Sequence, residues 1–369
     1  MDQQTDSFKK RFFEIDLLKV LVIICMFGIH IGETIFSKEW EGFEYCLLSP
    51  LISQIMMIMI IIVPFSFMFA MGCTMLSSRN KSPQKWIKRG IILLLCWLLV
   101  NVLRSFSLYT LFLRDTYPFS VGNIIYLLSV PDILFFAGLF FLFCGLLSAC
   151  RVSENIIIIV GILINIAVNL IFKFQAIEGI PTFWDNLAGG FVHIPKVSSF
   201  SFCNWIIVPI FGMIWGKFLC SKFSRDKLYN ISFFVGILGC LICFKFFWLH
   251  IYISSVVMYD NVQTAYAMLP TTVLTGIFIV LLLLAVFYKF EKLLTSFCIK
   301  ERIINFAKNL PIFYIIHWGV IAVLILIIPR PTHQYPIYIC FLLAIFLIPF
   351  CNNCVNFISM YINKNKKIL

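Results

Sequence analysis

Four ionisable side chains occur in or beside the first apolar segment of the chain, and together they could carry out proton or group transfer. Asp16, Lys19, His30 and Glu33 belong to a stretch long enough to cross a membrane as a helix. In a helix, Lys19 and His30 lie within about 20° of one face, Asp16 lies about 40° from His30, and Glu33 is about one turn beyond His30. We therefore predict one stripe of ionisable groups that faces the interior of a helix bundle.

The stripe has a direction that suits transfer across a membrane. Asp16 and Lys19 begin the segment, and His30 lies about 20 Å further along the helix axis. Ionisable groups inside a membrane are energetically expensive and therefore indicate function. An imidazole is the side chain best suited to proton transfer near neutral pH. The alternative is that Asp16 and Lys19 form an i,i+3 ion pair near the interface and that His30 is a satisfied interior polar group.

Other candidate residues lie further along the chain. His317 is near the middle of a late apolar segment, beside aromatic residues. The alternative role for this histidine is structural hydrogen bonding. Asn101 and Arg104 share one helix face, and Asp132 begins a later apolar segment. These last three residues could pair with one another or hold a sugar hydroxyl.

A basic cluster lies between the second and third apolar segments. It includes Arg79, Lys88 and Arg89, which could bind the phosphates of a cytoplasmic cofactor. The alternative needs no ligand, because cytoplasmic loops of membrane proteins collect lysine and arginine.

The elements that position all these residues are predicted to be membrane-spanning helices. The chain has 369 residues, of which 61% are hydrophobic and only 12% are charged, against about 25% charged residues in soluble domains. The apolar excess must face lipid, so the net charge of +12 indicates cytoplasmic loops and no nucleic-acid partner. We predict an all-α polytopic transmembrane bundle of about ten spans. Their approximate ranges are 15–35, 51–76, 87–107, 131–150, 155–174, 202–219, 231–249, 266–288, 310–329 and 336–361.

The charge distribution predicts that the N- and C-termini are both cytoplasmic, because alternate loops then hold most of the lysines and arginines. We expect one transmembrane domain, 1–369, with a cytoplasmic N-terminal segment 1–14 and a cytoplasmic basic tail 362–369. Two polar segments, 105–130 and 175–200, are predicted to cover a site at the outer face or to be ordinary connecting loops. Short loops with Phe- and Ile-rich spans favour a bacterial cytoplasmic membrane.

Several enzyme classes lack their motifs here. The sequence has no P-loop, no H-E-x-x-H and no G-x-S-x-G, which argues against an ATP-driven pump and a serine hydrolase. The cysteines follow no zinc-binding spacing, and we expect no metal.

The start of the chain resembles a known group of enzymes. Segment 11–19, RFFEIDLLK, followed by His30, resembles the opening of polytopic membrane acyltransferases. Two related families share this opening, the heparan-α-glucosaminide N-acetyltransferase-like family and acyltransferase family 3. Lys19 stands where both families usually have arginine, which keeps the charge and loses the bidentate fork.

Later segments favour the first of the two families. Segment 65–72, FSFMFAMG, with 88–90, KRG, looks like its second and third spans. Segment 132–139, DILFFAGL, is similar to its D-I-L-Q-x-x-G-L segment, and 209–216, PIFGMIWG, is similar to its P-W-x-G-x-x-x-G span. Segment 314–318, YIIHW, resembles the Y-L-I-H segment near the end of both families.

The resemblance implies an enzyme that takes an acyl group, usually acetyl, from cytoplasmic acyl-CoA and delivers it to an amine or hydroxyl of an extracytoplasmic sugar or glycolipid. Acetyl-CoA would be a cosubstrate, membrane lipid and a carbohydrate acceptor would be partners, and a homodimer is compatible with the sequence. His30 would act as general base or as a transient acyl carrier. The implied site is catalytic His30, Asp16 and Lys19, substrate-binding His317, Glu33, Arg104, Asp132 and Asn101, and cofactor-binding Arg79, Lys88 and Arg89.

Other functions stay open at this point. Acyltransferase family 3 would imply O-acylation of a cell-surface polysaccharide. A transporter or flippase for a sugar or lipid intermediate is a second class, although such proteins often contain inverted repeats and paired broken helices, which we do not find. A non-catalytic membrane partner is a third class, and the ionisable stripe argues against it.

Overall fold

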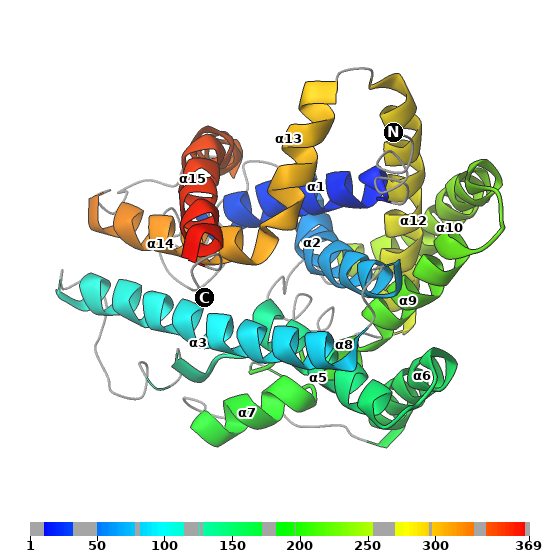
Figure 1. The fold of residues 1–369 in the computed structure, drawn as a ribbon, viewed down its shortest axis with the longest axis horizontal. Helices are drawn as coiled ribbons and strands as arrows, with labels where there is room; N and C mark the ends of the chain where they lie inside the picture. The colour runs from blue at the N-terminus through cyan, green and yellow to red at the C-terminus, as the bar shows by residue number, and fades with distance from the viewer. Residues whose placement is uncertain are drawn as a thin grey trace.

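Every regular element in the described part of the chain is a helix (Figure 1). The computed structural model describes residues 11–31, 50–77, 82–113, 125, 128–171, 182–195, 197–253, 270–294, 297–327 and 337–365. The helices are α1 (Phe13–Ile31), α2 (Pro50–Ser77), α3 (Pro83–Leu113), α5 (Ile133–Ala149), α6 (Glu154–Ile171), α7 (Phe183–Phe191), α8 (Phe202–Trp205), α9 (Ile207–Cys220), α10 (Arg225–Ile253), α12 (Pro270–Leu293), α13 (Phe297–Lys308), α14 (Leu310–Ile327) and α15 (Ile337–Asn365). The predicted all-α fold is therefore confirmed for these residues.

Seven of the described helices are long and apolar enough to cross a membrane. Two further apolar stretches, Ile62–Ser77 in α2 and Ile133–Ala149 in α5, are shorter. Each of the ten predicted spans contains a helix, and the predicted span 202–219 is formed by α8 and α9 together. The count of ten crossings and the cytoplasmic side of both termini stay predictions.

Two short helices were not predicted. α7 lies within the segment 175–200 that we expected to cover the outer face. It begins with a capping box, in which Thr182 and Asp185 satisfy each other's backbone N–H groups. α13 lies in a segment predicted to be a cytoplasmic loop. Both are too short to span a membrane, so span counting from hydropathy does not detect them.

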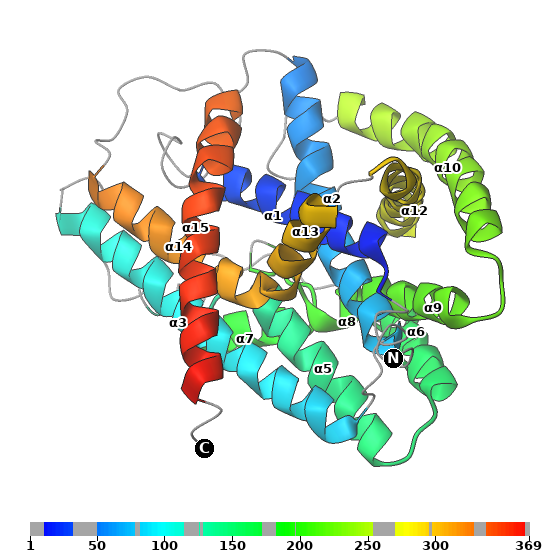
Figure 2. The same cartoon turned by 45° about the horizontal axis from the view of Figure 1, so that its top comes forward.

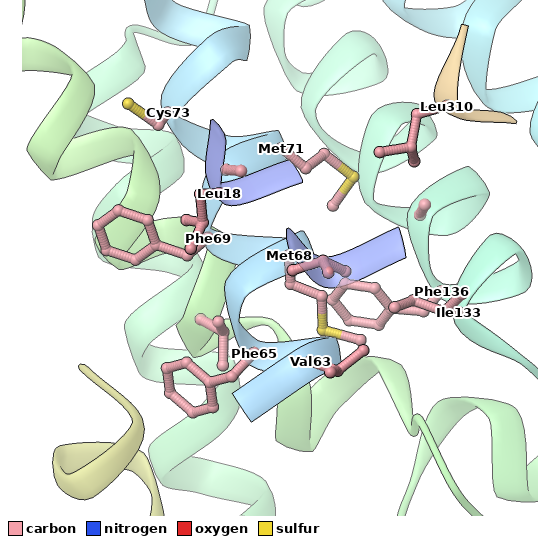
Figure 3. Packing of buried hydrophobic residues seen from close by; sticks show 14 of the residues in the cluster. Leu18, Val63, Phe65, Met68, Phe69, Met71, Cys73, Ile133, Phe136 and Leu310 are labelled. Atoms are coloured by element: carbon pink, nitrogen blue, oxygen red, sulfur yellow. The ribbon is translucent and has the colours of Figure 1, made fainter. Parts of the chain in front are cut away.

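α1 runs through the middle of the bundle and packs against α2, α12, α13, α14 and α15 (Figures 1 and 2). The core gathers around this helix and α2. In Figure 3, Leu18 of α1 lies near Phe69 of α2, while Met68 and Met71 of α2 lie on the side of Phe136 of α5 and Leu310 of α14. These contacts fix α1 with respect to α5 and α14, which supply residues of the candidate site.

The closest helix contact is between α2 and α9, and glycine makes it possible. A methyl group added at Gly212 of α9 would lie 2.1 Å from the carbonyl oxygen of Phe69, and one added at Gly72 of α2 would lie 1.9 Å from the carbonyl oxygen of Pro209. Both obstacles are backbone atoms, which cannot rotate away as a side chain can. The two helices therefore approach each other as small residues allow in membrane bundles.

We predict that Gly212→Ala lowers the free energy of unfolding by about 2 kcal/mol, because α9 must move away from α2. Gly319→Ala on α14 is the matched control. A methyl group there meets no described atom within 4 Å, and alanine improves helix propensity by about 1 kcal/mol. Thermal unfolding of both variants in detergent checks this, and equal melting temperatures would contradict the close contact.

Candidate functional site

Two histidines from α1 and α14 lie in contact. The rings of His30 and His317 stack, with centroids 5.5 Å apart and an angle of 22° between their planes. Phe27 of α1 and Phe313 of α14 pack against the His317 ring. His317 is fully buried, and neither of its ring nitrogens makes a well-formed hydrogen bond to a described residue. The fold thus joins two histidines that the sequence analysis considered in separate spans.

An ion pair lies beside the histidines. Nη2 of Arg104, on α3, is 3.6 Å from Oδ2 of Asp132 and 3.4 Å from the hydroxyl of Tyr314, on α14. The Tyr314 hydroxyl donates a hydrogen bond to the same carboxylate oxygen at 3.1 Å. Asp132 and Tyr314 are buried. One carboxylate therefore neutralises a largely buried guanidinium and connects three helices. We predicted that these residues pair with one another or hold a sugar hydroxyl, and the structure contains the pairing of Arg104 with Asp132.

Local structure explains where Asp132 sits. Its Oδ1 accepts hydrogen bonds from the backbone N–H groups of Leu134 and Phe135, so that it is the N-cap of α5. Asn101 of α3 donates to the backbone carbonyl of Val130 at 3.0 Å and thereby holds the chain just before the cap. Asn101 has a structural contact here in addition to the substrate-binding role predicted for it.

Trp318 connects the ion pair to the histidines. The guanidinium carbon of Arg104 lies 4.2 Å from the centre of the Trp318 ring, which is a cation–π contact. The Trp318 ring in turn lies 4.6 Å from the His30 ring and 5.5 Å from the His317 ring, measured between centroids. Four helices, α1, α3, α5 and α14, thus contribute to one buried polar cluster.

Asp16 and Lys19 lie at the opposite end of α1. Arg11 binds both oxygens of the Asp16 carboxylate, at 2.5 and 3.1 Å, and Nζ of Lys19 is 3.7 Å from Oδ1. Helix geometry separates Asp16 from His30 by about 21 Å. The structure therefore contains the i,i+3 pair that was the alternative for these two residues, and it does not bring them to the histidine pair.

Next to them is a buried carboxylate that the sequence analysis did not single out. Both oxygens of Glu14 accept hydrogen bonds from Nη2 of Arg225 at 3.0 Å, and one also accepts from the Tyr229 hydroxyl. Arg225 is also 3.7 Å from Glu291 of α12. The first turns of α1 and α10 and the last turn of α12 are tied together, and all three ends were assigned to the cytoplasmic side by charge. The sequence did contain a signal for this contact. Glu14 is a second acid beside Asp16 at the start of an apolar segment, and a buried charge needs a partner.

The remaining predicted residues are dispersed. Lys88 and Arg89 are exposed in the first turns of α3, and the Arg89 guanidinium lies 4.6 Å from the ring of Phe141. Glu33 and Arg79 lie outside the described residues. Within the described ranges, no three His, Cys, Asp or Glu side chains gather as metal ligands would.

Tyr314 and Trp318 are cluster residues that the sequence pattern did not indicate. Both belong to the segment 314–318, in which only His317 was named. Their spacing was a usable signal. His317 and Trp318 follow Tyr314 by three and four positions, so that all three side chains share one face of a helix.

A third histidine, His193, lies outside the membrane-spanning helices. His193 follows α7, and its backbone N–H donates to Oδ1 of Asn204 at 3.0 Å. Burial lowers the pKa of the imidazole from its ordinary value of 6.5 to about 4. Between these two pH values the unfolded chain binds the proton more tightly than the folded protein, so stability falls as the pH decreases through this window.

We predict that His193→Gln reduces the acid sensitivity of the fold by about 1 kcal/mol, since the partly exposed ring feels only part of the burial. The measurement is thermal unfolding of both proteins between about pH 7 and about pH 4.5. Parallel losses of melting temperature in the two proteins would show that His193 is not a source of the acid sensitivity.

Comparisons of this chain with known protein families, with characterised proteins and with solved structures gave no match. The resemblance to membrane acyltransferases therefore rests on the short segments described above. What the protein does has to be argued from the chemistry of the residues that the fold brings together.

Proposed function

We propose that this protein is an integral membrane acyltransferase. It would transfer an acyl group, acetyl in the first instance, from acyl-CoA at the cytoplasmic side to a hydroxyl or amine of a sugar or glycolipid at the other side. The observation that supports this most is the stacked pair of His30 and His317 beside the buried ion pair of Arg104 and Asp132. Acyl transfer needs a positioned base in a site that excludes bulk water.

His30 is the proposed base. Its side chain is partly exposed, whereas His317 is fully buried, so a substrate reaches His30 first. The acceptor oxygen or nitrogen attacks the thioester carbonyl carbon, and its proton passes to an imidazole nitrogen. Collapse of the tetrahedral intermediate breaks the carbon–sulfur bond, and the leaving thiolate takes the proton from the imidazolium. The products are the ester or amide and the thiol of coenzyme A.

The donor would bind at the other end of the same helices. Lys19 lies in the first turns of α1 and Arg89 in the first turns of α3, and the charge distribution assigns both helix ends to the cytoplasmic side. Along each helix, about 16 to 22 Å separates the basic residue from the histidine or from Arg104. Cations bind the phosphates of the donor at one end, and the acyl group reaches the histidines at the other. In this arrangement Asp16 holds the Lys19 ammonium in position, and the observed ion pair between the two side chains is consistent with such a role.

We predict that the protein purified in detergent binds acetyl-CoA and hydrolyses it slowly, with water in place of the acceptor. His30→Gln is expected to lower the rate by about 10²-fold or more, because glutamine cannot take the proton. His317→Gln is expected to lower it as well, since it removes the ring against which His30 stacks. Release of the coenzyme A thiol and retention of radiolabelled acetyl-CoA provide the two measurements.

The matched control is His193→Gln, which makes the same chemical change outside the histidine cluster. Its rate is expected to equal that of the unaltered protein within about twofold. If His30→Gln and His317→Gln keep the full rate, the reaction centre is elsewhere. If the unaltered protein fails to bind acetyl-CoA at about 1 mM, the acyltransferase proposal fails and a sugar or lipid transporter becomes the better explanation of the ionisable residues.

A further inference from the structure

Several buried nitrogens without hydrogen-bond partners among the described residues gather at one place. They are Nε of Arg104, Nε1 of Trp318 and both ring nitrogens of His317. The three side chains touch one another, because the guanidinium lies over the indole and the indole packs against the imidazole. Other such atoms occur singly elsewhere in the described chain, for example in Ser66, Trp215 and Arg225. Native proteins satisfy nearly all their buried polar groups, so a cluster of this kind calls for an explanation.

The chemistry of these nitrogens defines the group that would satisfy them. The guanidinium Nε–H and the indole N–H can only donate hydrogen bonds, and a neutral imidazole adds one donor and one acceptor. The cluster therefore offers three donors and a single acceptor. The complementary group is an oxygen rich in lone pairs, such as a carbonyl oxygen, and more strongly an oxyanion, since charge-assisted hydrogen bonds are the stronger ones.

The donors are held in place by contacts that leave them available. Nη2 of Arg104 faces Tyr314 and Asp132, and Nη1 faces Oδ1 of Asn101 at 3.5 Å, so that Nε is not engaged by these partners. The indole N–H of Trp318 lies close enough to the Tyr314 hydroxyl to interact with it, but this contact is not a well-formed hydrogen bond and leaves the donor available. Donors that are fixed before the reaction are the requirement for stabilising a transient negative charge.

We propose that Arg104 Nε–H and Trp318 Nε1–H form an oxyanion-binding subsite for the carbonyl oxygen of the transferred acyl group. This inference rests on the acyltransferase function proposed above and adds two catalytic residues to it. When the acceptor attacks the carbonyl carbon, the π electron pair moves to the oxygen, and the two N–H groups bind the resulting oxyanion. When the carbon–oxygen double bond re-forms, the pair returns and the thiolate leaves, so no other reactant is needed.

The test is Trp318→Phe, which keeps an aromatic ring against His30 and removes the N–H group. We expect kcat for acetyl-CoA hydrolysis to fall by about 10²-fold, the usual effect of losing one oxyanion donor. Binding of free coenzyme A, which has no acyl carbonyl, is expected to change by less than about threefold, because the lost interaction forms only during the reaction. Trp215→Phe is the matched control, since its indole nitrogen is also buried without a described partner but lies on α9, and its kcat should stay within about twofold.

Arg104→Lys provides a second variant, which keeps the positive charge beside Asp132 and removes the Nε–H group. The same loss of kcat with unchanged coenzyme A binding would support the subsite, even if Trp318→Phe does not fold. Full kcat in a folded Trp318→Phe or Arg104→Lys protein would overturn the subsite and leave the acyltransferase proposal standing. Absence of any turnover in the unaltered protein would overturn both, so the two failures are distinguishable.

Discussion

The polar cluster depends on one buried carboxylate, that of Asp132. One of its oxygens caps the first turn of α5, and the other meets the Tyr314 hydroxyl and the Arg104 guanidinium. A charge in an apolar bundle is tolerated only when a partner and hydrogen bonds replace water. Removal of one member of such a pair typically costs about 3 to 5 kcal/mol. Asp132 therefore ties α3, the start of α5 and α14 together beside Trp318 and the histidines.

The same requirement for pairing acts at the other end of α1, with a different result. There Asp16 and Glu14 are saturated by Arg11 and Arg225, so these acids stabilise helix ends and have little capacity left for a substrate. At the His30 end, the ion pair with Asp132 leaves Nε of Arg104 unengaged, and the ring nitrogens of the neighbouring His317 and Trp318 also lack hydrogen-bond partners among the described residues. A single helix thus has at one end an ionic cluster in which both acids are paired and Nε of Arg225 is the buried nitrogen without a described partner, and at the other end a cluster in which three neighbouring side chains have such nitrogens. This contrast is the physical basis for our proposal that the second cluster is the functional one.

Close packing makes the geometry of the bundle stiff enough for such a site. Gly72 and Gly212 bring the backbones of α2 and α9 into direct contact, and Phe69 of α2 and Leu18 of α1 belong to the same buried core. Charge stabilisation in a reaction works best with donors that do not have to reorganise. Rigid helices that meet through small residues provide such a scaffold, whereas flexible loops would not.

The sequence by itself determined the membrane class, the all-α fold and the approximate position of each long helix, because apolar runs of sufficient length have only one stable form in lipid. It also singled out His30, His317, Arg104 and Asp132, since ionisable groups in apolar segments are conspicuous. Only the tertiary structure decided which of them meet. Helical periodicity placed Asp16, Lys19 and His30 on one stripe, yet residues on one face of a helix can be about 20 Å apart along its axis. The rings of His317 and Trp318 on α14 are nearer to His30 than Asp16 and Lys19 are. Tyr314 and Trp318 became site residues only through contacts between helices, which periodicity within one segment does not encode.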